Sequence, residues 1–188
     1  MKKILFTLFM GLIILPLAAQ NTRNLPLDLN IIIDDSSAFR ESGQEAIDWL
    51  NRQFLEQVLL DGDRITVWAA GSRVEQIYSG TVTGSGNEAA ELGSRLSSLG
   101  MAGAQADFAG ALREVSQRLS QPTQGRLSVT MLISASASSL EPLLGGSSRG
   151  LLRWSRSLRY QGWQVIVLDP NLGPRVQSAA LSYMNSRR

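Results

Sequence analysis

The run Asp34-Asp35-Ser36-Ser37 places two carboxylates and two hydroxyls side by side in the sequence. It directly follows residues 27–33, which end in three consecutive isoleucines, a pattern typical of a buried parallel strand. Polar side chains at the carboxyl end of a strand can form a ligand site, but Asp and Ser also dominate ordinary polar turns. The run therefore indicates either a binding site at the end of a strand or a turn with no further function.

The first twenty residues have the pattern of a secretory signal. Lys2 and Lys3 precede the apolar residues 4–17, and Ala18-Ala19 follow them. An apolar stretch below the ~20 residues of a membrane span, with a cationic start and small residues behind it, is typical of a cleavable signal; an uncleaved anchor is the alternative. We expect a signal peptide over 1–20, a short linker over 21–26 and one domain over 27–188. The localisation predicted is periplasmic or secreted, without an integral membrane span after cleavage.

Missing residue types exclude most enzyme chemistry. The sequence has no His and no Cys, and no Lys follows Lys3. A Ser-His-Asp triad, a Cys-His pair, a Schiff base and a thiolate or imidazole metal site therefore cannot form in the exported chain. The enzyme alternative left is a periplasmic hydrolase using carboxylates only, for which Asp34 and Asp35 are a poor pair because successive side chains often point apart. We predict that the protein is not an enzyme.

Net charge at first suggests a basic protein, because the 188 residues carry a formal charge of +2. Without residues 1–20, the 16 arginines balance 16 acidic residues, and an exported chain of zero formal charge is not expected to bind nucleic acid. The arginines are concentrated late in the sequence, where Arg149, Arg153 and Arg156 lie on one stripe of an expected helix, with Arg159 nearby. These four arginines are a candidate patch for an anionic partner, or simply a solvated helix face.

Hydrophobic periodicity predicts alternating strands and helices. The expected strands are 27–33, 64–70, 74–78, 127–133 and 163–168, and the expected helices are 42–60, 87–99, 108–119, 149–160 and 174–185. Asp107 is placed to cap the helix over 108–119. The pattern predicts an α/β fold: a mostly parallel central sheet with one antiparallel edge strand and helices on both faces. The loops at 34–41, 100–107 and 134–142 should meet at the carboxyl ends of the strands.

The motif Asp34-x-Ser36 after the first strand, together with this order of elements, resembles a von Willebrand factor type A (VWA) domain. The resemblance extends from about Asp28 to the end of the sequence and implies a Rossmann-like VWA fold. It also implies a metal-ion-dependent adhesion site (MIDAS). That site comprises Asp-x-Ser-x-Ser after the first strand, a Thr before a later helix and an Asp after the fourth strand.

Three of those five ligand positions hold alanine here. Ala38 stands in place of the second Ser, Ala106 in place of the Thr and Ala135 in place of the second Asp, which leaves Asp34 and Ser36. Mg²⁺ demands near-ideal octahedral geometry, so two ligands should not hold it, and we predict a degenerate MIDAS with neither metal nor cofactor. The alternative is a shifted register, with oxygens from neighbouring side chains: Asp35, Ser37, Asp107, Ser134 and Ser136.

We therefore predict an exported, non-enzymatic VWA-like module that binds another protein of the cell envelope. The predicted partner-binding residues lie on the loops at the strand ends and are Asp34, Asp35, Ser36, Ser37 and Asp107. An Mg²⁺-dependent adhesion-type VWA domain with shifted ligands and the carboxylate-only hydrolase remain the alternatives.

Overall fold

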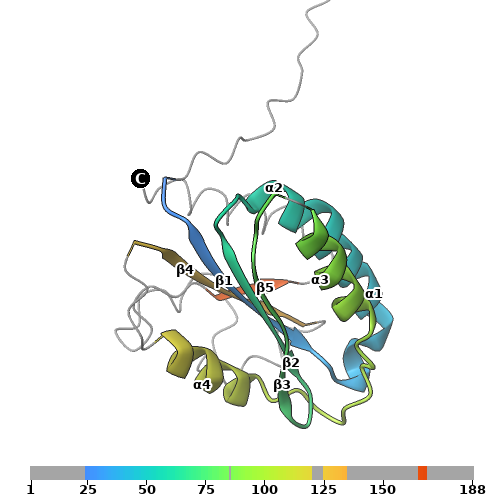
Figure 1. Ribbon diagram of the computed structural model, residues 1–188. Helices are drawn as coiled ribbons and strands as arrows, with labels where there is room; N and C mark the ends of the chain where they lie inside the picture. The colour runs from blue at the N-terminus through green and yellow to red at the C-terminus, as the bar shows by residue number, and fades with distance from the viewer. Residues whose placement is uncertain (1–23, 85, 120–124, 135–164, 169–188) are drawn as a thin grey trace, which may run out of the picture.

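The computed structural model describes residues 24–84, 86–119, 125–134 and 165–168 (Figure 1). Their strands form one sheet in the order β3-β2-β1-β4-β5. The strand bounds are β1 Leu27–Asp34, β2 Arg64–Ala70, β3 Val74–Thr81, β4 Leu127–Ile133 and β5 Val165–Leu168. Neighbouring strands are parallel except for β2 and β3, which form an antiparallel hairpin at the edge. The predicted mostly parallel sheet with one antiparallel edge strand is confirmed.

Helices cover both faces of this sheet (Figure 1). Their bounds are η1 Ser37–Phe39, α1 Arg40–Trp49, η2 Leu50–Leu55, α2 Glu56–Val58, α3 Asn87–Ser97 and α4 Phe108–Leu119. The segments from η1 to α3 lie on one side, and α4 lies on the other. The single helix expected over 42–60 is a helical run of three parts whose middle, η2, is a π-helix. The helices expected over 149–160 and 174–185 lie outside the described residues.

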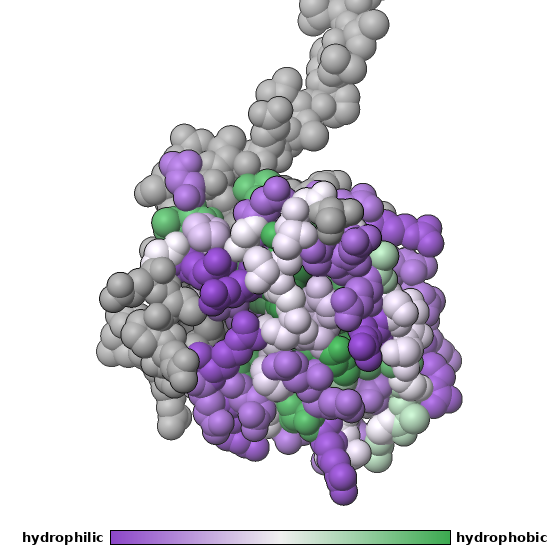
Figure 2. Space-filling model, viewed as in Figure 1, coloured by the Kyte–Doolittle hydropathy of each residue, from purple (hydrophilic) through white to green (hydrophobic). Residues whose placement is uncertain are grey.

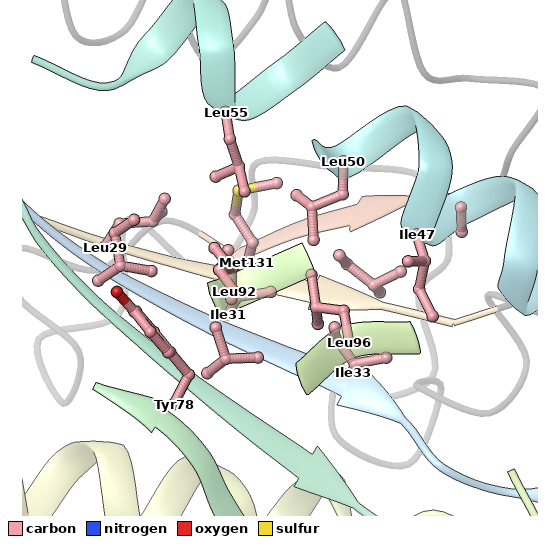
Figure 3. Packing of buried hydrophobic residues seen from close by; sticks show 14 of the residues in the cluster. Leu29, Ile31, Ile33, Ile47, Leu50, Leu55, Tyr78, Leu92, Leu96 and Met131 are labelled. Carbon is pink, nitrogen blue, oxygen red and sulfur yellow. The ribbon is translucent and has the colours of Figure 1, made fainter. Parts of the chain in front are cut away.

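The main hydrophobic core lies between the sheet and the helices from α1 to α3 (Figure 3). Alternate residues of β1, among them Leu29, Ile31 and Ile33, point to this side, where Ile47 and Leu50 pack against them. A second cluster under α4 contains Ile32, from the opposite face of β1. Every residue of β1 is buried, including the polar Asp28, Asn30 and Asp34, and the three consecutive isoleucines of its second half match burial on both faces.

A buried carboxylate fixes the amino-terminal end of the sheet. Asp63, in the turn before β2, is 0% exposed, and its two oxygens accept the N–H groups of Leu27 and Leu60 at 2.7 Å each. Arg126 Nη1 donates to the carbonyls of Leu27 and Gly62 at 3.2 and 2.9 Å. Side chains therefore hold the first residue of β1 to the turn between α2 and β2.

The surface is polar where the described helices face outward. Figure 2 shows mainly hydrophilic residues on this face, with hydrophobic residues visible only in small areas. Leu25 and Leu60 are the large apolar side chains exposed among the described residues, at 39% and 40%. Within the part of the chain that is described, no helix combines the length and the apolar character needed to cross a bilayer.

Tyr78 on β3 gives the folded state a sensitivity to alkali. Burial raises the pKa of its phenol above the usual value, and the charges of Glu91 and Glu88 raise it further. The unfolded chain therefore loses this proton first, so stability that is complete below about pH 10 falls as the pH rises toward the raised pKa. Tyr78→Phe should lose less stability over that range, measured as the urea midpoint against pH. Equal losses in both proteins would show that Tyr78 does not control the effect.

Candidate functional site

The carboxylate at the end of β1 is fully engaged inside the protein. Asp34 is 3% exposed, and its Oδ1 accepts the N–H of Ser36 at 2.8 Å. Its Oδ2 accepts the hydroxyl of Ser134, which is 1% exposed, also at 2.8 Å. β1 and β4 are parallel with Ile33 opposite Ile133, so the residues that follow them, Asp34 and Ser134, lie next to each other at the strand ends. The bond to the turn N–H is the one expected for an Asp at this position.

The adjacent carboxylate of Asp35 holds a different loop. Its Oδ1 accepts the N–H of Met101 at 2.7 Å, and its carbonyl accepts the N–H of Gly103 at 3.1 Å. Its Oδ2 lies over Gly71, where an added Cβ would sit only 3.2 Å away. Asp34 and Asp35 therefore point to separate partners, and Asp35 ties the loop at 100–107 to the end of β1.

The two serines of the motif differ in exposure. Ser36 is 4% exposed and forms a parallel bridge with Gly103, whereas Ser37 is exposed. The N–H of Ser37 donates to the carbonyl of Gly103 at 2.7 Å. The bridge and these bonds confirm that the loops at 34–41 and 100–107 meet at the strand ends. Ser37 and the neighbouring Ala38 face solvent, so they can contact a partner directly.

Met101, which is not among the residues predicted for the site, is held from both sides. Its backbone has a φ of 44°, and its carbonyl accepts from Arg40 Nε at 3.3 Å and Arg40 Nη2 at 3.1 Å. Its sulfur packs so closely on α1 that a Cβ at Gly43 would lie 2.3 Å from it. A glycine inside a helical pattern can mark such a close approach, and Gly43 was the available signal.

Asp107 caps α4, as predicted. Its Oδ1 accepts the N–H of Gly110 at 2.7 Å, and its own N–H donates to the carbonyl of Gly71 at 3.2 Å. The structure thus brings Asp34, Asp35 and Asp107 to one end of the sheet, with each carboxylate bonded to a backbone N–H. Their role in binding a partner stays a prediction.

Several residues named from the sequence lie outside the described part of the chain. They are Ala135 and Ser136 after β4, and the four residues of the arginine patch, Arg149, Arg153, Arg156 and Arg159. Beyond Ser134, the loop at 134–142 therefore has no described geometry, and the anionic-partner patch remains a prediction.

Comparison with solved structures identifies the architecture. The structure matches proximal thread matrix protein 1 from the mussel byssus with a TM-score of 0.53 and 13% identity, over 77% of this chain and 37% of that one. It matches a von Willebrand factor type A structure from Catenulispora acidiphila with a TM-score of 0.51 and 12% identity, over 85% of this chain and 43% of that one. The chain has the VWA fold. It spans less than half of either matched chain, and its sequence matches no family model and no curated protein.

The VWA fold implies a MIDAS at this end of the sheet, so its ligand positions can be compared with the residues present. Ala38 is exposed and Ala106 is half-buried, and neither side chain carries an oxygen. Asp34, which is retained, uses both carboxylate oxygens in internal bonds. Among the described residues, no three acidic side chains are grouped so that they could share a metal ion. The residues present fit a MIDAS cation poorly.

Proposed function

We propose that this chain is an exported VWA-like module that binds another protein through the strand-end face without a metal ion. The observation that carries the proposal is that the acidic side chains at the strand ends accept hydrogen bonds from the protein's own backbone. Asp34, Asp35 and Asp107 each hold a backbone N–H, so they build the face instead of presenting free ligands. Such bonds fix the loops in one arrangement, which lowers the entropic cost of binding.

The side chains exposed on this face are mostly small and uncharged. Together with one arginine, they are Ser37, Ala38, Ser72, Arg73, Ala102, Ala104 and Gln105. A surface of this kind can recognise a partner by shape and by hydrogen bonds to its backbone and hydroxyl groups. We define these seven residues as the strand-end surface.

The shifted-register alternative requires side-chain oxygens that already form hydrogen bonds within the fold. Asp35 Oδ1 and Asp107 Oδ1 accept the N–H groups of Met101 and Gly110, and the Ser134 hydroxyl donates to Asp34. A cation that recruited these groups would have to break the bonds that position the loops. The metal-free proposal is therefore favoured over an Mg²⁺-dependent adhesion domain.

A binding role also suits the chemistry better than hydrolysis. A carboxylate-only hydrolase needs two carboxyl groups about 5 to 10 Å apart across a cleft that admits substrate. Here Asp34 is buried, and Asp35 turns away from it toward Met101. Export and a partner in the cell envelope are supported by the secretory pattern of residues 1–20.

The proposal is tested by chemical cross-linking in the source cells, with the full chain tagged at its carboxyl terminus. Ala38→Arg places a long cation on the strand-end surface and should reduce recovery of the main partner at least about tenfold, because blocking a central contact costs 1.4 kcal/mol or more. Ala90→Arg, the same change at an exposed position of α3, is the matched control and should have no effect. EDTA should leave recovery unchanged.

Two outcomes would contradict the proposal. Equal recovery with Ala38→Arg and Ala90→Arg would place the contact away from the strand-end surface. Loss of recovery in EDTA would instead favour the Mg²⁺-dependent alternative with shifted ligands.

A further inference from the structure

A cavity of about 260 Å³ lies at the end of the sheet opposite the strand-end surface. It is bounded by η2 and α2, the first residues of β2, the segment after β3 and the start of α3. Ile65, the second residue of β2, lies in its wall, whereas the strand-end surface adjoins the other end of the strands. The cavity is therefore independent of the proposed protein-binding function.

The floor of this cavity is apolar and belongs to the main core. Leu55, Ile65 and Leu92 line it, and none is more than 4% exposed. Figure 3 shows Leu55 and Leu92 reaching the core from two different helical segments. Leu59 and Val82 complete the apolar wall and pack against the same core. The floor is thus a fixed apolar surface rather than a gap between loose loops.

The rim carries negative charge and hydrogen-bond acceptors. Three carboxylates line the cavity, from Glu56, Asp61 and Glu88, and none of the described lining residues is positively charged. The Asp61 carboxylate lies against Gly84 on this rim, because a Cβ at Gly84 would lie 2.9 Å from its oxygens. Asn51 also lines the cavity, although its Oδ1 is buried and accepts no hydrogen bond from the described residues. The cavity therefore favours a ligand that brings donors and positive charge.

We infer that the cavity binds a small primary amine with an apolar body. The apolar part would pack against the apolar floor and wall, and the ammonium group would donate to the rim carboxylates. A cavity of about 150 Å³ accommodates benzene, so the larger volume here suits a ring with a short aminoalkyl chain. An anion is disfavoured because the three carboxylates outweigh the partial positive charge at the start of α3.

Three probes of matched shape test this inference by isothermal titration calorimetry with the full chain. They are 2-phenylethylamine, its neutral isostere 2-phenylethanol and the anion 3-phenylpropionate. The amine should bind with a Kd at least about tenfold lower than the alcohol, equivalent to 1.4 kcal/mol of charge and hydrogen-bond energy. 3-Phenylpropionate should bind more weakly than the alcohol.

Variants then assign the binding to this cavity. Glu56→Gln combined with Asp61→Asn should raise the Kd of the amine about tenfold and leave the Kd of the alcohol unchanged. Glu75→Gln removes an exposed carboxylate near the opposite end of β3 and should change neither Kd. Ala89→Phe, at an exposed α3 position that lines the cavity, should block both probes without unfolding the protein.

The inference is overturned if the amine and the alcohol bind equally, or if neither binds. It is also overturned if Ala89→Phe leaves amine binding intact while its melting temperature matches that of the wild type, because the amine would then bind elsewhere. None of these results bears on the strand-end surface.

Discussion

Asp63→Ala is expected to lower the free energy of unfolding by about 4 kcal/mol, because hydrogen bonds to a charged group contribute roughly 1.5 to 3 kcal/mol each. Asp63 is 0% exposed and accepts two backbone N–H groups at 2.7 Å, those of Leu27 and Leu60. Alanine leaves both donors without their acceptor, the Leu27 N–H in the interior and the Leu60 N–H in a partly buried turn. Asp63→Asn should also be damaging, since its amide offers one acceptor oxygen where two are used. Urea unfolding at neutral pH measures each loss.

Asp48→Ala is the matched control for this change. Asp48 is an exposed acid on α1 that accepts a hydrogen bond from Gln44, so its loss should change stability by no more than about 0.5 kcal/mol. If Asp63→Ala unfolded at the same urea concentration as the wild type, water would have to replace the carboxylate at both N–H groups. The amino-terminal end of the sheet would then be less closed than the structure shows.

Sequence reasoning succeeds in this protein where one local signal determines an element. Residues 127–133 form a strand and 108–119 a helix with the expected bounds. The strand is a short apolar run between polar residues, and the helix follows a capping Asp107 whose side chain bonds to Gly110 three residues later. Both signals lie within the element or directly beside it, so they do not depend on the rest of the fold.

The contacts that fix the two ends of the sheet join residues far apart in the sequence. Asp63 reads as part of a turn after a helix, yet its oxygen accepts the N–H of Leu27, 36 positions earlier. Asp35 and Arg40 hold Met101 across 66 and 61 positions. Hydrophobic periodicity carries no information on such pairs, because it reports only which face of an element is buried.

The candidate site shows the same contrast between local features, which the sequence predicts, and long-range contacts, which it does not. The sequence indicates the chemical types at the strand end and the three alanines that replace MIDAS ligands. It does not reveal how the remaining oxygens are used. The sequence offers Ser134 as a spare ligand for a cation, whereas in the structure its hydroxyl donates to Asp34, 100 positions away. The carboxylate thereby gains a neutral partner in the interior, where an unpaired charge would be costly.

This arrangement leads to the second prediction, on Asp34→Ala, which should lower the free energy of unfolding by about 3 kcal/mol in the presence of EDTA. The side chain is 3% exposed, and its removal leaves the N–H of Ser36 and the hydroxyl of Ser134 without their acceptor. Ser134→Ala should cost about 2 kcal/mol, because one buried carboxylate oxygen then lacks a donor. Ser37→Ala, at the exposed serine of the same turn, should stay within about 0.5 kcal/mol and serves as the control.

The same variants distinguish a structural carboxylate from a metal ligand. If Asp34 stabilises the fold by its internal hydrogen bonds, Mg²⁺ or Mn²⁺ should leave the wild-type melting temperature unchanged. The loss of stability in Asp34→Ala should then be equal with and without the ion. A cation bound to the folded state alone would stabilise it by mass action. A rise in the wild-type melting temperature that EDTA reverses and Asp34→Ala abolishes would therefore establish a shifted metal site and overturn the metal-free proposal. Since Ala38 and Ala106 supply no oxygen and both oxygens of Asp34 are hydrogen-bonded, we expect no such rise.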